Sequence, residues 1–258
     1  MISHIHKFRE KLAAGRFCLG TGITFADPSV VEALSPSVDF FWIDLEHNPT
    51  SLESLLAHLI AARAGGAPAL VRVPSSDIAW TKRVLDSGAE GIILPQAGSA
   101  AEIRAFVSSC RYPPMGTRGF GPRRPTNYGR FGGKEYLQFA NENVFVVAQI
   151  ETVSALNEID EIVRIPGLDS LVVGPYDLSG SMGIPGQVHD PRVLAAIETV
   201  VAKARPAGIW VGMGMGADSG HALEAARLGV NWAQCGNDFE FMIRATEKLY
   251  AEVRKELK

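Results

Sequence analysis

Two carboxylates follow consecutive apolar runs of the sequence, at points where buried strands would end. Glu151 follows the run 144–150, and Asp177 follows the run 170–174. If these runs are neighbouring parallel strands, both acids face one site. Two oxygen ligands leave positions open for water and a bidentate substrate, which suits Mg²⁺ or Mn²⁺. The alternative is that both carboxylates cap helices, and their spacing favours neither interpretation.

A histidine and an arginine occupy comparable positions. His47 lies three residues after Asp44, and an Asp–His pair can fix the tautomer of an imidazole that acts as a base. Glu46 could take the place of Asp44, and a surface histidine fits the spacing equally well. Arg72 lies inside the apolar run 69–73, where a buried guanidinium needs an anion, either a substrate oxygen or the carboxylate of Asp44 or Glu151.

The lysines limit the chemistry that this site could perform. None of the eight lysines lies at the end of a predicted strand. Aldolases that form a Schiff base need a buried lysine at such a position. A metal ion that accepts electron density from an enolate is the remaining common solution.

Short apolar runs alternate with amphipathic helical patterns along the whole chain, and this alternation predicts the elements that position these residues. Eight such units in about 250 residues favour a single α/β domain, a closed (β/α)8 TIM barrel over residues 1–258. The strands are expected at 17–22, 40–44, 69–73, 91–95, 144–150, 170–174, 210–213 and 231–235.

Two segments depart from the repeat. Residues 112–143 form a long insertion rich in Gly, Pro and Arg, and long loops of this kind are usually functional. Its Arg118, Arg123 and Arg124 could clamp an acidic substrate, remain in solvent or hold a subunit contact. Residues 238–258 predict a long charged helix that closes the barrel base or reaches a neighbouring subunit.

Composition excludes several classes of protein. The 258 residues carry a formal net charge of −3, which gives no reason to expect nucleic acid as a partner. No stretch of about 18 residues is free of charge, so no membrane span is expected. Three cysteines without a CxxC pairing predict no disulfide framework and fit a reducing cytoplasm.

The ordered set of motifs in this chain resembles the HpcH/HpaI aldolase family, the class II pyruvate aldolases that act on substrates such as 4-hydroxy-2-oxoheptanedioate and 2-dehydro-3-deoxyglucarate. The similarity runs from about residue 16 to 240. Each motif is weak alone, but their order is specific. The motifs are WIDLEH at 42–47, VRVP at 71–74, LDSGA at 85–89, GIILP at 91–95, RYPPMGTRG at 111–119, QIET at 149–152 and GPYDLS at 174–179.

The resemblance implies a TIM barrel of the phosphoenolpyruvate/pyruvate type that uses a divalent cation (Mg²⁺ or Mn²⁺, with Co²⁺ as a further candidate). It implies cleavage of a 4-hydroxy-2-oxo acid to pyruvate and an aldehyde, and the reverse addition. Glu151 and Asp177 match the metal ligands of the family. Arg72 matches the arginine that contacts the pyruvate oxygen, and His47 matches the catalytic histidine.

Further positions follow from the same resemblance. Asp44 would orient His47, and Asp86 would help to place the histidine from a neighbouring subunit. Family members are usually hexamers, built as trimers of dimers with an exchanged C-terminal helix, which residues 238–258 would supply. The remaining pyruvate contacts are expected at Gln149, Gly174, Pro175 and Tyr176.

Three features differ from better-known members and bear on the aldehyde half of the substrate. They are bulky Tyr176, Gln96 after the fourth strand, and residues 119–125 of the insertion. Two other functions stay open: a citrate lyase β-like enzyme that acts on a CoA thioester, and a non-catalytic barrel that binds a ligand. The first would need a basic channel, and the second would have no need to keep Glu151, Asp177, His47 and Arg72.

Overall fold

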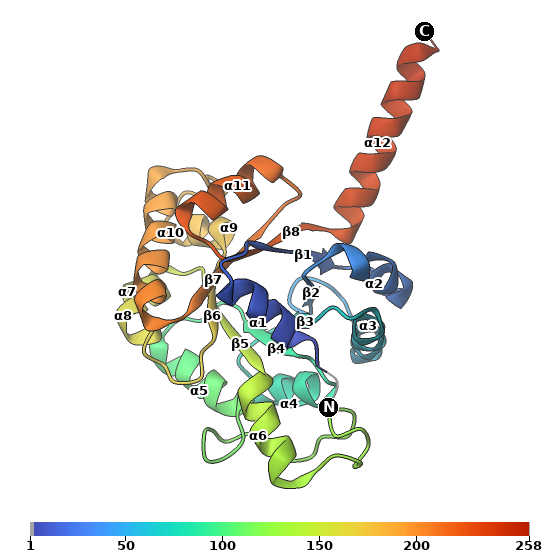
Figure 1. Ribbon diagram of the computed structural model, residues 1–258. Coiled ribbons are helices and arrows are strands. Elements are labelled where there is room, and N and C mark those ends of the chain that lie inside the picture. Colours follow the sequence, from blue (N-terminus) through green and yellow to red (C-terminus); the bar gives the residue numbers. More distant parts are fainter. Residues whose placement is uncertain (1–2, 258) are drawn as a thin grey trace.

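The computed structural model describes residues 3–257 and contains one closed, all-parallel barrel of eight strands in sequence order (Figure 1). Each strand pairs with the next, and β1 also pairs with β8. The eight strands predicted from the sequence are all present. They are β1 (Cys18–Ile23), β2 (Phe40–Asp44), β3 (Ala69–Arg72), β4 (Gly91–Leu94), β5 (Phe145–Ile150), β6 (Ser170–Val173), β7 (Trp210–Met215) and β8 (Trp232–Asn237).

Helices surround the barrel, and most of them begin at a side chain that accepts a backbone N–H. Asp77, for example, accepts from Ala79, and Ser51 accepts from Ser54. Such N-caps satisfy the free amides of a first turn and keep βα loops short. The helices are α1 (Ile5–Ala13), α2 (Pro28–Leu34), η1 (Ser35–Ser37), α3 (Leu52–Gly65), α4 (Ile78–Asp86), α5 (Ala100–Cys110), α6 (Gly133–Asn143), α7 (Val153–Asn157), α8 (Ile159–Ile162), α9 (Pro175–Ser181), α10 (Pro191–Ala204), η2 (Arg205–Ala207), α11 (Ser219–Leu228) and α12 (Asp238–Glu256).

Two apolar layers build the core. The larger layer lies between the strands and the surrounding helices, and the smaller one fills the inside of the barrel. Helix α1 closes one end, because its apolar side chains at Ile5, Phe8 and Leu12 belong to the inner layer. Phe8 packs against Phe40 and Trp232 with ring centroids 5.1 and 6.0 Å apart. The base is therefore closed by the N-terminal helix rather than by the C-terminal one.

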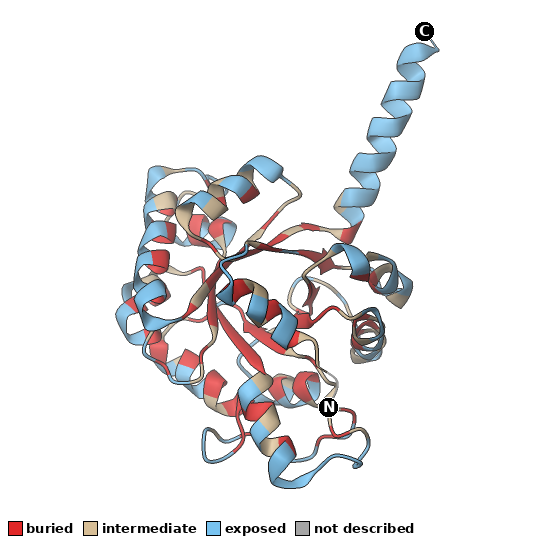
Figure 2. Cartoon of the chain, in the orientation of Figure 1, coloured by how far each residue is buried: buried red, intermediate tan, exposed pale blue. Residues whose placement is uncertain are grey.

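Helix α12 points away from the barrel (Figure 1). Only Asp238 at its start is buried, and every described residue from 241 onward is exposed (Figure 2). Asp238 accepts hydrogen bonds from the backbone and the hydroxyl of Thr24 and from the backbone of Phe25, so it fixes the base of the helix. The predicted long C-terminal helix is confirmed, and it makes few contacts with its own barrel.

The insertion packs against the outside of the barrel and contains α6. Asn141 accepts a hydrogen bond from the backbone of Tyr112 and donates one back to its carbonyl. Arg118 and Arg124 are buried, whereas Arg123 is exposed. Two of the three arginines therefore hold the insertion in place. No helix among residues 3–257 combines the length and apolarity needed to cross a bilayer, and all three cysteines are free.

Candidate active site at the barrel mouth

A cavity of about 450 Å³ opens at the carboxyl ends of the strands. Eight of the ten site residues predicted from the sequence line it. A ninth, Glu151, lies behind Gln149, whose Nε2 donates to its Oε2 over 2.7 Å. The eight lining residues are Asp44, His47, Arg72, Gln149, Gly174, Pro175, Tyr176 and Asp177.

Arg72 is the centre of the charged network in this cavity. Its Nε and Nη2 donate to the two oxygens of Asp44 over 2.8 Å each, and its Nη1 lies 3.0 Å from Glu46 Oε2. The guanidinium also lies over the ring of Trp42, 5.4 Å from its centroid. Burial disfavours the charge, but the bonds and charge of Asp44 outweigh it and raise the pKa of Arg72. A two-point pair of this kind fixes the plane of the guanidinium.

The carboxylate of Asp44 accepts hydrogen bonds both from Arg72 and from the loop that follows β2. Besides Arg72 it accepts from the backbone of Glu46 at 3.0 Å, the backbone of His47 at 3.4 Å and the side chain of Asn48 at 3.0 Å. The expected contact between Asp44 and the imidazole of His47 is not formed within the chain. The carboxylate that lies near the imidazole is Glu46, 3.7 Å from Nε2.

His47 itself lies at the rim, with 62% of its side chain exposed. Glu46 beside it is largely buried, and burial raises its pKa although Arg72 and His47 oppose the shift. The sequence named Glu46 only as an alternative to Asp44. Because both follow the same strand, the spacing could not decide which of the two turns toward the imidazole.

Glu151 is the most deeply buried carboxylate of the site, with 1% of the residue exposed. Its pKa is raised to about 7, because burial and the charges of Asp177 and Glu46 outweigh the backbone N–H of Gln96 and the charge of Arg72, which lower it. Gln96 donates that N–H over 2.5 Å from a left-handed conformation, φ 51°. The sequence pointed to Gln96 as unusual, but its contribution here is a backbone amide that orients the carboxylate.

The space around Glu151 depends on Gly174. A Cβ at this glycine would lie 2.7 Å from Glu151 Oε2 and 3.2 Å from its Cβ. Asp177 then stands in the first turn of α9, on the wall of the same cavity. The two carboxylates come from neighbouring strands, because β5 and β6 pair directly.

These residues fit a divalent cation. A buried acid whose charge is opposed by burial and by a second acid is stabilised by a cation between them. No set of three His, Cys, Asp or Glu side chains with metal-binding geometry occurs in the part of the chain that the structure describes. Two carboxylates, with water and substrate oxygens as the remaining ligands, give the oxygen coordination that Mg²⁺ and Mn²⁺ prefer.

Asp86 lies outside this cavity. It pairs with Arg118 of the insertion, whose Nη2 lies 2.7 Å from Asp86 Oδ1.

Of the three features expected near the aldehyde, only Tyr176 lines the mouth, where it is 60% exposed. Gln96 and residues 119–125 do not line it. A further part of the wall, formed by Gly214, Gly216, Gln234, Asn237 and Glu240, comes from the end of β7, the loop after it, β8 and α12. Nothing in the sequence pointed to Gln234, Asn237 and Glu240, because they lie in no recognisable motif.

Comparison with known proteins agrees with this geometry. The HpcH/HpaI aldolase/citrate lyase family matches residues 25–245. A 4-hydroxy-2-oxovalerate aldolase of Rhodococcus jostii is 38% identical over 210 residues, 81% of each chain. A hydroxypyruvate/pyruvate aldolase of Pseudomonas aeruginosa is 32% identical over 95% of this chain and 91% of its own.

The fold agrees as well. The crystal structure of an HpcH/HpaI aldolase from Desulfitobacterium hafniense superposes with a TM-score of 0.87 at 31% identity, covering 95% of this chain and 96% of that one. Family match, relatives and fold thus converge over nearly the full length. The chain belongs to the HpcH/HpaI aldolase/citrate lyase family.

Proposed function

We propose that the protein is a divalent-metal-dependent aldolase that cleaves a 4-hydroxy-2-oxo acid to pyruvate and an aldehyde and catalyses the reverse addition. The observation that carries this proposal is that Asp177 and Arg72 line one open cavity, with Glu151 directly behind Gln149 of its wall. The relatives named as aldolases of 4-hydroxy-2-oxovalerate and of hydroxypyruvate or pyruvate support it.

The metal, held by Glu151 and Asp177, would supply a positive charge that polarises the 2-oxo acid. The substrate carboxylate fits the first turn of α9. Pro175 has no amide hydrogen there, so the free backbone donors begin at Tyr176. Gln149 lines the same wall.

Arg72 stabilises the negative charge that develops on the 2-oxo oxygen during the reaction. When the C3–C4 bond breaks, its electron pair moves toward the 2-oxo group to give the enolate of pyruvate. The guanidinium, held in plane by Asp44 and supported by Glu46, donates to that oxygen without having to reorganise. A proton from water in the open cavity, which replaces the one lost from the C4 hydroxyl, adds to C3 of the enolate and completes pyruvate.

His47 takes the proton of the C4 hydroxyl as the aldehyde forms, directly or through a water molecule. Its imidazole stands at the rim of the cavity beside Glu46. A carboxylate at this distance stabilises the imidazolium that results. In the direction of addition the same group returns the proton to the new alkoxide.

The experiment compares Arg72→Ala and His47→Ala with the unaltered protein in the presence of Mg²⁺ or Mn²⁺. We expect Arg72→Ala to lower kcat by about 10²–10³-fold, as for other donors to a developing oxyanion. General-base loss in His47→Ala should cost about 10²–10⁴-fold. Exposed Arg123→Ala and exposed His6→Ala are the matched controls. Near-normal cleavage by both site variants would remove this mechanism.

The structure weakens the argument for a CoA thioester substrate. A CoA channel would need the arginines of the insertion, but Arg118 pairs with Asp86 and Arg124 donates to the carbonyls of Ser87 and Leu59. A panel of aldehydes offered with pyruvate or hydroxypyruvate and Mn²⁺, read by mass spectrometry, would identify the acceptor.

We also propose that α12 is exchanged between two copies of the chain, as part of a hexamer. Beyond Phe241, its apolar side chains at Met242, Leu249, Tyr250 and Val253 are 50–57% exposed. An apolar hollow of about 530 Å³ lies between α11 and the start of β1, lined by Phe17, Leu19, Leu223 and Phe241. A helix α12 from a second copy would cover the hollow, and its own exposed apolar side chains would be buried in the same contact.

A further inference from the structure

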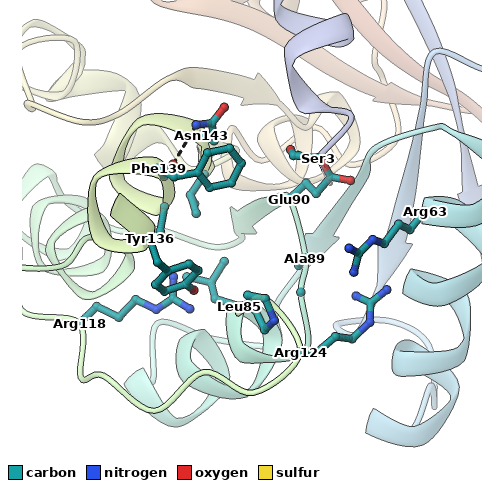
Figure 3. A pocket seen from close by; sticks show the side chains of 14 residues that line it. Ser3, Arg63, Leu85, Ala89, Glu90, Arg118, Arg124, Tyr136, Phe139 and Asn143 are labelled. Atoms are coloured by element: carbon teal, nitrogen blue, oxygen red, sulfur yellow. Dashed lines mark hydrogen bonds between the residues drawn. The ribbon is translucent and has the colours of Figure 1, made fainter. Parts of the chain in front are cut away.

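A second, smaller cavity lies at the other end of the strands from the mouth. It holds about 80 Å³ and includes Glu90 and Val144, which directly precede β4 and β5. Its walls come from α3, the turn between α4 and β4, the insertion and α6 (Figure 3). None of the residues assigned to the mouth lines it.

Two arginines form one side of this cavity. The side chains of Arg63 and Arg124 extend toward each other from different elements (Figure 3). Arg124 is buried and donates only to backbone carbonyls, those of Ser87 at 2.9 Å and Leu59 at 3.0 Å. No ion pair joins either arginine to an acidic side chain within residues 3–257. Burial and the charge of Arg63 lower the pKa of Arg124.

A third arginine leaves a donor unused. Arg118, with 3% of the residue exposed, pairs through Nη2 with Asp86, but its buried Nε has no hydrogen-bond partner. The acid on the cavity wall, Glu90, is held by the start of the chain. Its Oε2 accepts from the hydroxyl of Ser3 and from the backbone of His4 and Ile5.

The charges of this region do not cancel. Three cations, Arg63, Arg118 and Arg124, face two carboxylates, Asp86 and Glu90, so one positive charge remains. A buried charge without a counter-ion is costly, and an anion in the cavity would offset it. A single negative charge balances the site.

The opposite wall is apolar. Leu85, Tyr136, Phe139 and Ala140 line it, and all but Phe139 are buried. One water molecule needs about 10–15 Å³ of this kind of volume, so the cavity has room for about five to eight non-hydrogen atoms. The occupant must therefore be small, carry one negative charge and present an apolar part.

We propose that this cavity is a binding site for a short-chain monocarboxylate, with the carboxylate between Arg63 and Arg124 and the alkyl part against Tyr136 and Phe139. The site is independent of the aldolase reaction. An occupant would bridge α3, the insertion and α6, and so stabilise the folded protein by mass action.

The test is isothermal titration calorimetry with butanoate, which has six non-hydrogen atoms and no 2-oxo oxygen with which to chelate a metal at the mouth. We expect one butanoate per chain and a matching rise in Tm. Neutral butanamide should bind at least tenfold more weakly, because it lacks the charge that the arginines recognise. Inorganic phosphate lacks the apolar part and should also bind more weakly than butanoate.

Four variants locate the binding. Arg63→Met removes one cation from a half-exposed position and should weaken butanoate about tenfold or more, whereas Arg63→Lys should retain part of the affinity. Exposed Arg104→Met on α5 is the matched control and should bind normally. Arg72→Met, at the mouth, should also bind normally.

Other results would overturn the proposal. They are no binding of butanoate, equal binding of butanamide, or unchanged affinity in Arg63→Met. Loss of butanoate binding in Arg72→Met with retention in Arg63→Met would instead place the carboxylate at the mouth. Circular dichroism of each variant verifies that it is folded.

Discussion

At the scale of single residues, the site is a network in which each charged group orients another. Asp44 fixes Arg72, Glu46 lies between Arg72 and His47, and Gln149 and Gln96 orient Glu151. Residues that share partners in this way do not contribute independent energies. Substitutions here should therefore couple strongly.

Asp44→Asn tests this coupling. The amide keeps the shape of the carboxylate but cannot accept both guanidinium donors as an anion, so Arg72 loses its fixed plane. We expect kcat/KM to fall about 10–100-fold, in line with about 1.5–3 kcal/mol for a hydrogen bond to a charged group. In a double-mutant cycle with Arg72→Ala the two losses should not add. Simple additivity would show that Asp44 acts elsewhere, for instance on His47.

Gly174→Ala tests the space beside Glu151. The added Cβ would lie 2.7 Å from Glu151 Oε2 and push the carboxylate aside. We expect the affinity for Mn²⁺, measured by calorimetry, to fall about 10–100-fold, as when partners that orient a metal ligand are altered. Gly180→Ala in α9, the helix that Gly174 precedes, is the control, because nothing lies within 4 Å of its added Cβ. Equal Mn²⁺ affinities in the two variants would argue against Glu151 as a ligand.

At the scale of elements, α3 contains a fully buried histidine that the reaction does not use. His58 is 0% exposed, and neither ring nitrogen has a hydrogen-bond partner. Burial lowers its pKa, although the backbone of Phe25 and the charges of Asp238 and Asp27 oppose the shift. The folded protein therefore keeps this imidazole neutral.

Because of His58, we expect the folded protein to lose stability in mild acid. Because the folded-state pKa lies below the unfolded value of about 6.5, the unfolded chain binds the proton more readily. The contribution to stability is complete above pH 6.5 and is lost as the pH falls through 6.5 toward the folded-state pKa. Urea unfolding between pH 7.5 and 5 should show a smaller decline in His58→Met than in the unaltered protein. His6→Met, at an exposed position, should decline like the unaltered protein.

At the scale of the whole molecule, the barrel is closed, but large apolar side chains remain exposed on its outer surface and on α12. Leu19 of β1 is 45% exposed beside the hollow that Leu223 and Phe241 also line, while Leu249 and Val253 of α12 are 56% and 50% exposed. Under the proposed exchange, the exposed apolar side chains of α12 and the apolar hollow beside β1 would meet in one interface between two copies of the chain.

Removing residues 245–258 should therefore change assembly more than folding of the barrel. We expect multi-angle light scattering to show a smaller oligomer, because the exchanged contact is lost, while circular dichroism retains the barrel signal. Leu249→Asp with Val253→Asp should act in the same direction, and Glu247→Gln with Glu252→Gln on the same helix should not. An unchanged mass in the truncated protein would rule out exchange of α12.

The sequence by itself determined the barrel, because a strand buried on both faces must be apolar almost throughout and the repeat of such runs with amphipathic helices is local information. It also placed Glu151, Asp177, Arg72 and His47 at strand ends, which a parallel barrel brings to one face. Side-chain partners between neighbouring strands were not determined in this way. Asp44 bonding to Arg72 rather than to the imidazole, and the amide of Gln96 turned toward Glu151, depend on side-chain directions.

Only the tertiary structure decided the longer-range contacts as well. Which helix closes the base, where α12 leaves the barrel, and how Arg63 and Arg124 come together follow from packing between segments far apart in the chain. Hydrophobic burial is non-directional, so periodicity shows that a face is buried but not which surface covers it.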